Sequence, residues 1–130
     1  PRDAGLSAAA DQMIAFFKLE HLAGEPAEGL SYGQQKLLDA AMAFMAGPRL
    51  VLLDEPAGGV NLTMLANLKD RLKAFNQERG ATFVVIEHNM DFVMSLCTRV
   101  IVLAEGKVLA EGLPADVRTN PAVIEAYLGH

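Results

Sequence analysis

Two apolar runs, with an amphipathic stretch between them, restrict most strongly how this chain can fold. The runs are RLVLLDEP at residues 49–56 and TFVVIEH at residues 82–88. Each run is apolar without alternation, which is typical of a strand buried on both faces. The stretch between them, residues 62–80, carries leucines at helical spacing and ends at Gly80. Strand, helix and strand in this order predict a parallel sheet with a crossover helix.

Helices are predicted on the N-terminal side of the first strand. Apolar residues at offsets of three and four indicate one helix over residues 7–22. A second begins at Ser31, because Ser31 and Gln34 fit the S-x-x-Q capping box, and it ends at the Gly-Pro pair of residues 47–48. The chain before the first strand is therefore predicted to be helical, apart from a turn-rich segment at residues 23–29.

The pattern changes after the second strand. Residues 89–97 fit a short helix, and residues 99–112 hold two apolar strands around Glu105-Gly106, which predicts a tight hairpin. Two short helices follow, each with proline near its first turn. The predicted fold class is therefore α/β, with a mostly parallel sheet and a C-terminal antiparallel hairpin.

Composition and charge indicate which partners and surroundings to expect for this chain. The 130 residues are 52% hydrophobic and carry a net charge of −5, with no stripe of lysine and arginine. A nucleic-acid partner is therefore not expected, because binding to phosphates needs a basic surface. The single cysteine, Cys97, excludes an internal disulfide and favours a reducing compartment. No apolar run approaches the roughly 18 residues of a membrane span, so a soluble chain is expected.

Polar side chains follow both predicted strands at the end where ligands bind in open α/β sheets. Asp54 and Glu55 end the first run, and His88 ends the second. Ligands in such folds sit outside the carboxyl ends of the strands. The two acids and the histidine are thus candidates for holding a metal-bound water, a nucleophile or a phosphate. Taken alone, the two acids are equally well explained as the solvated end of a strand, and His88 is better explained as a polar residue that caps one.

The start of the second helix is a further candidate. Free backbone N–H groups at a helix N-terminus attract anions, and Gly33 has no Cβ to keep a phosphate away. Ser31 serves as a cap or offers its hydroxyl to a ligand. An ordinary capped helix accounts for the same residues, and this pattern taken alone favours that explanation.

In combination, the motifs resemble the C-terminal part of an ATP-binding cassette (ABC) ATPase. LSYGQQ stands where that family has its signature, LVLLDEP is similar to the Walker B strand with its following glutamate, AGGVN to the D-loop, and His88 to the switch histidine. In finer detail, LSYGQQKLLDAAMAF, DEPAGGVN, IEHNMDFVMSLC and NPAVIEAYLG resemble the cassettes of branched-chain amino acid uptake systems. Five positions depart from the common family pattern: Tyr32 replaces glycine, Gly58-Gly59 replace Ser-Ala, Asn61 replaces aspartate, and Leu62 stands where related sequences often have proline.

The resemblance implies part of a RecA-like P-loop NTPase core and a division of the chain. Residues 1–47 would be the end of the helical subdomain with the signature helix, 48–112 the Walker B and switch-histidine part of the catalytic core, and 113–130 a C-terminal helical tail. The sequence contains no G-x-x-x-x-G-K-[ST]. The chain is therefore expected to be the second half of a cassette, and to be inactive towards ATP by itself.

The resemblance also implies residue roles for ATP and Mg²⁺. Asp54 would hold Mg²⁺ through water, Glu55 would be the general base, and His88 would contact the γ-phosphate. The signature residues would contact ATP held by the other subunit, and Asn61 would act in the D-loop between subunits. The signature residues are Ser31, Gly33 and Gln34.

The partners implied are a second cassette, membrane permease subunits and, indirectly, a substrate-binding protein. The protein would be an ATP hydrolase at the cytoplasmic face of the cell membrane. Two alternatives remain: an ABC ATPase without a transport function, and a non-enzymatic α/β interaction module. Exposed apolar strands are expected to cause self-association into a dimer or a swapped assembly.

Overall fold

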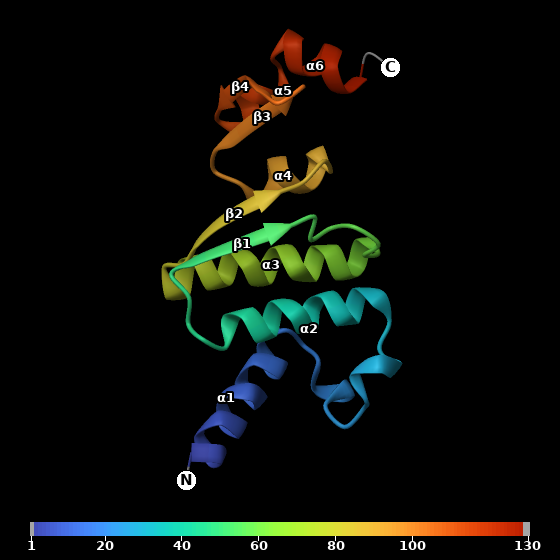
Figure 1. Cartoon of the computed structure of the whole chain (residues 1–130), viewed down its shortest axis with the longest axis vertical. Helices are drawn as coiled ribbons and strands as arrows, with labels where there is room; N and C mark the ends of the chain where they lie inside the picture. The colour runs from blue at the N-terminus through green and yellow to red at the C-terminus, as the bar shows by residue number, and fades with distance from the viewer. Residues whose placement is uncertain (1, 129–130) are drawn as a thin grey trace. The chain divides into compact units, whose positions relative to one another are not determined.

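The structure is a computed structural model that describes residues 2–128, and it divides into two compact units (Figure 1). The second unit begins at Glu87. The first contains α1 (Arg2–Phe16), η1 (Glu20–Leu22), η2 (Ala27–Gly29), α2 (Tyr32–Phe44), β1 (Leu50–Asp54), α3 (Leu62–Arg79) and β2 (Thr82–Ile86). The second contains α4 (Met90–Leu96), β3 (Val100–Ala104), β4 (Lys107–Gly112), α5 (Pro114–Arg118) and α6 (Pro121–Leu128). Among the described residues, no helix is both long and apolar enough to cross a membrane.

The predicted strand–helix–strand unit is confirmed. β1 and β2 pair in parallel, with Leu50 opposite Thr82 and Asp54 opposite Ile86, and α3 connects them. The helix ends where the sequence predicted: Gly80 has φ of 66°, a left-handed conformation that glycine adopts without steric cost. The carboxyl ends of the two strands consequently lie side by side.

The prediction that both strands are buried on both faces is wrong for this chain. Val51 is buried, and its register partner Phe83 packs its ring against Phe44 and Phe75 from the helices. The opposite face remains in solvent, with Leu52 72% exposed and Ile86 63% exposed. An unbroken apolar run therefore marks a strand with two apolar faces, but it does not show that both faces are covered within the same chain.

The core of the first unit is a cluster of aromatic rings. Phe44 of α2 stacks on Phe75 of α3 with ring centroids 4.2 Å apart, and Phe17 tilts against Phe44 at 5.5 Å. All three rings are almost fully buried. Offset and edge-on ring contacts add to the free energy of burial, so this cluster fixes α2 and α3 against the sheet.

The first helix ends earlier than residue 22, where the spacing predicted its end. Lys18 has φ of 58°, and the backbone N–H of Leu19 donates to the carbonyl of Ile14 at 2.9 Å. These are the features of a Schellman motif, in which Leu19 also buries its side chain. Glycine usually occupies the left-handed position, so a lysine there gave no signal in the sequence.

The second unit is built on the predicted hairpin. β3 and β4 pair antiparallel through a two-residue turn at Glu105 and Gly106, whose φ angles are 50° and 75°. Two positive φ values are the geometry of the favoured hairpin turns. A small core holds the hairpin against its helices; its buried members are Val100, Val102, Val117 and Val123. The two strand pairs form separate two-stranded sheets.

Candidate functional site

The start of α2 has the predicted capping box. Ser31 Oγ accepts a hydrogen bond from the Gln34 backbone N–H at 3.3 Å, and Gln34 Oε1 accepts one from the Ser31 N–H at 2.9 Å. Gly33 is buried, and a Cβ placed on it would lie 2.8 Å from Met64 Sδ. Gly33 therefore lets α2 approach the start of α3, a packing reason that the sequence did not reveal.

The two carboxylates at the end of β1 have different backbone environments. Asp54 is the last residue of the strand, and its side chain is exposed. Glu55 lies just past the strand with φ of 48°, a left-handed conformation, and its N–H donates to the Ile86 carbonyl at 2.8 Å. The side chain of Glu55 is therefore aimed by a turn rather than by the alternation of a strand.

The carbonyl of Glu55 anchors that turn. It accepts from the Gly58 N–H at 3.2 Å and from Lys36 Nζ, on α2, at 2.7 Å. Sequence reasoning missed Lys36, because nothing in the sequence links a lysine on one helix to a carbonyl 19 residues later. The first turns of α2 and the residues after β1 are thus in direct contact.

Asn61 begins α3 as its N-cap. Its Oδ1 accepts from the Met64 N–H at 2.9 Å, which satisfies one of the free donors of the helix. Asparagine and aspartate cap equally well, so the neutral residue at this position keeps the structural role. The predicted role of Asn61 between subunits stays a prediction.

In the second unit, His88 stands two residues after the end of β2, and its side chain is 75% exposed. Its backbone N–H and that of Asn89 both donate to the carboxylate of Glu87, at 2.9 and 3.0 Å. The Glu87 side chain is only 1% exposed. Glu87 thus fixes the turn that carries His88, although the sequence had suggested no role for it.

The residues present could supply one of the several ligands that Mg²⁺ needs. Within the described part of the chain, no group of three or more His, Cys, Asp or Glu side chains is arranged to hold a metal ion. Mg²⁺ in nucleotide sites usually takes one or two carboxylates, with waters and substrate phosphates as its other ligands. The exposed carboxylate of Asp54, at the carboxyl end of a parallel strand, fits that use.

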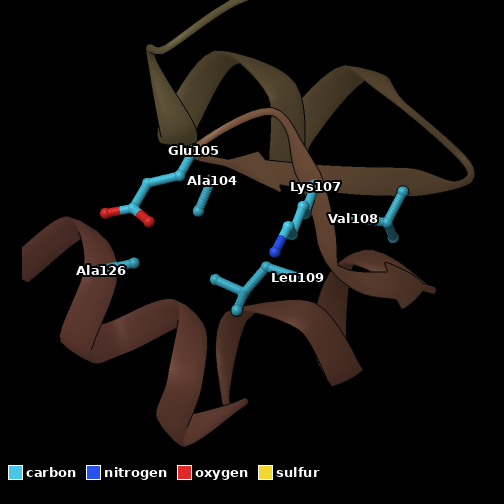
Figure 2. A pocket seen from close by; sticks show the side chains of 6 residues that line it. All are labelled: Ala104, Glu105, Lys107, Val108, Leu109 and Ala126. Atoms are coloured by element: carbon cyan, nitrogen blue, oxygen red, sulfur yellow. The ribbon is translucent and has the colours of Figure 1, made fainter.

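A cavity of about 490 Å³ lies in the second unit, between the hairpin and α6 (Figure 2). Two of its lining residues are charged, Glu105 and Lys107, and the others are apolar. None of the predicted site residues lines it. This cavity therefore does not bring the predicted site residues together.

Comparison with known proteins finds matches within one family. A model of the ABC transporter family matches residues 3–58, and a model of branched-chain amino acid ATP-binding cassette transporters matches residues 107–130. A probable branched-chain amino acid transport ATP-binding protein LivG from Archaeoglobus fulgidus is 38% identical over 91% of the chain. The high-affinity branched-chain amino acid transport ATP-binding protein BraF from Pseudomonas aeruginosa is 41% identical over 85%. The chain is homologous to ABC-transporter ATP-binding cassettes.

The solved structures agree with this assignment. This chain superposes on an ATP-binding cassette of an ABC transporter, crystallised in its ADP conformation, with a TM-score of 0.85 and 31% identity. The match covers 97% of this chain and 51% of that one. The family resemblance and the fold class predicted from the sequence are therefore confirmed. The chain spans less than half the length of the curated relatives, 46% of LivG and 44% of BraF.

Proposed function

We propose that the protein containing this chain is the ATP-binding and ATP-hydrolysing subunit of an ABC transporter that drives uptake of branched-chain amino acids. The similarity to LivG and BraF over 85–91% of the chain carries this proposal. The match of residues 107–130 to the branched-chain amino acid family model supports the substrate class, since that model describes a narrower group than the general ABC model.

In the proposed reaction, a water molecule attacks the γ-phosphate of ATP and ADP leaves. Glu55 takes the proton of the water as the new P–O bond forms and the bond to ADP breaks. His88 donates a hydrogen bond to the γ-phosphate, and Asp54 would hold Mg²⁺ through water. When bound, Mg²⁺ neutralises charge on the phosphates. Catalysis of this kind depends on position and charge rather than on covalent chemistry.

The start of α2 is assigned to ATP held by a second cassette. Backbone N–H groups and the positive end of the helix dipole favour an anion there. The residues concerned are Ser31, Gly33 and Gln34, and Asn61 is assigned to the contact between subunits. The proposed partners are a second cassette and permease subunits at the cytoplasmic face of the membrane. A substrate-binding protein would act through the permease.

The 130-residue chain by itself is expected neither to bind ATP tightly nor to hydrolyse it. The backbone nest and lysine that cradle the β- and γ-phosphates in P-loop proteins belong to a G-x-x-x-x-G-K-[ST] sequence, which this chain does not contain. Phosphate release from the purified chain with ATP and Mg²⁺ checks this expectation. Steady hydrolysis that Glu55→Gln abolishes would contradict it.

The decisive experiment uses the full-length protein with Glu55→Gln. Removing the base while keeping the shape should stop turnover and leave an ATP-bound dimer that persists during gel filtration. Glu78→Gln, an exposed residue near the end of α3, is the matched control and should hydrolyse ATP normally. A Glu55→Gln protein that turns over at the wild-type rate removes Glu55 from the mechanism.

Transport itself needs a separate measurement. In vesicles containing the cognate permease and binding protein, ATP hydrolysis should rise when a branched-chain amino acid is supplied, and labelled leucine should accumulate. Hydrolysis without any response to the permease favours an ABC ATPase without a transport function. Absence of both ATP binding and hydrolysis in the full-length protein favours the non-enzymatic interaction module.

A further inference from the structure

Two contacts connect the first turns of α2 with the loop 55–60, and a third, within α2, joins the two side chains that make them. The Lys36 ammonium donates to the Glu55 carbonyl at 2.7 Å, and it also lies 5.3 Å from the centroid of the Tyr32 ring. The Tyr32 ring lies against Gly59, where an added Cβ would come within 2.5 Å of Cε1. Lys36 is half-buried as a whole, and its hydrogen bond to the Glu55 carbonyl lies at an exposed site.

The backbone of Glu55 needs such support. A non-glycine residue with φ of 48° sits in a sterically unfavourable region, and it persists only where its surroundings hold it. Here the Glu55 N–H is fixed by Ile86 and the carbonyl by Gly58 and Lys36. The bond from Lys36 is charge-assisted and so stronger than one between neutral groups.

Tyr32 and Gly59 are the two sides of one contact. Both depart from the common family pattern, and the sequence offered no connection between them. The structure places the aromatic ring in the space that a side chain at residue 59 would need, and Gly59 also has φ of 69°, which disfavours any other residue. With the ring of Tyr32 in this position, a side chain at residue 59 would displace it.

We infer that Lys36 is a positioning residue for Glu55, and that Tyr32, packed on Gly59, holds Lys36 in place for that role. The inference rests on the proposed function of Glu55 as the base. It gives the first turns of α2 a second role, since they would set the backbone of the base in their own subunit as well as present the signature to ATP on the partner. Lys36 acts on the reaction only through the direction in which the Glu55 carboxylate points.

The test uses steady-state ATP hydrolysis by the full-length protein. Lys36→Met keeps most of the apolar stem and removes the donor; kcat should fall between about tenfold and a hundredfold, since a displacement of about 1 Å can cost a hundredfold. KM for ATP should change less than about threefold, because in this inference the lysine acts through Glu55 and not on the binding of the nucleotide. Lys36→Arg keeps a donor and should restore most of kcat. Lys73→Met, at an exposed position on α3, is the matched control and should behave like wild type.

Combination with Glu55→Gln separates this inference from the proposed function. If Lys36 acts through Glu55, Lys36→Met should lower the residual rate of the Glu55→Gln protein no further. Full activity of Glu55→Gln would overturn the proposed function. A large loss in Glu55→Gln, together with wild-type kcat in Lys36→Met or a loss that adds to that of Glu55→Gln, would overturn the positioning role alone.

A second pair of variants keeps the test valid if Lys36→Met folds poorly. Gly59→Ala should lower both kcat and the melting temperature, and Tyr32→Ala in the same protein should recover part of each loss by removing the ring from the Cβ. Additive losses for the two substitutions would show that the ring does not brace the loop, and would overturn that part of the inference.

Discussion

At the scale of single residues, Asn61 can be tested as a helix cap. Replacing Asn61 by alanine removes the acceptor for the Met64 N–H and should lower the free energy of unfolding by ~1 kcal/mol. Asn61→Asp retains an acceptor and places a negative charge at the positive end of α3, so it should match wild type or exceed it. Urea unfolding measures both variants. Equal stability of wild type and Asn61→Ala would show that the cap contributes nothing.

Cys97 gives a second residue-scale prediction, on pH. Burial of the Cys97 thiol raises its pKa, so in alkaline solution the unfolded chain ionises first. The contribution of the thiol to the free energy of unfolding should therefore be constant below about pH 8. It should fall as pH rises past the ordinary thiol pKa of about 8.5. Urea unfolding at pH 7 and pH 10 should show a smaller alkaline loss in Cys97→Ala than in wild type. Identical losses in the two proteins would exclude the thiol as the cause.

At the scale of elements, the aromatic cluster should determine whether α2 and α3 stay on the sheet. Phe44 contacts Phe17, Phe75 and Phe83, and Phe44→Ala should lower the free energy of unfolding by about 3–5 kcal/mol or abolish the cooperative transition. Met42→Ala, at an exposed position on the same helix, should change it by no more than about 0.5 kcal/mol. Similar urea midpoints for the two variants would mean that the cluster is not the core.

Features of these elements that depend on residues close together in the sequence were predicted, and contacts between distant residues were not. The capping box at Ser31 and the hairpin turn at Glu105 depend on residues within three positions of each other, and both were predicted correctly. The end of α1 was misplaced because Lys18 takes a conformation usually reserved for glycine. The contact of Lys36 with Glu55 joins separate elements through packing, which local pattern does not encode.

At the scale of the whole molecule, the order of motifs predicted the family and the fold class, and both were confirmed by comparison. The same sequence did not predict which faces of the strands are covered. The side chains on both faces of β1 and β2 are apolar, so both faces are suited to burial. Whether a face is exposed depends on whether another segment packs against it, which the sequence of the strand does not show. The proposed roles of Asp54, Glu55 and His88 involve a nucleotide and a partner, which lie outside this chain, and Glu55→Gln in the full-length protein tests the role of Glu55.

The uncovered sheet face provides the prediction at this scale. Its apolar side chains lie on the side of the β1–β2 pair opposite Phe83, and they are Leu50, Leu52, Val84 and Ile86. Each buried Å² of apolar surface is worth about 25 cal/mol, and contiguous apolar patches on soluble proteins mark interaction surfaces. The purified 130-residue chain should therefore self-associate, with an average mass by light scattering that rises with protein concentration.

Substitutions on this face should reverse the association. Leu52→Lys combined with Ile86→Lys places two charges where the apolar face would be buried, and it should shift the mass towards 13.9 kDa, that of a single chain. Met42→Lys removes an equally exposed apolar side chain from α2 and should leave the association unchanged. A wild-type chain that stays a monodisperse monomer would contradict the prediction. An equal effect of the α2 and sheet substitutions would show that general hydrophobicity, and not this face, drives association.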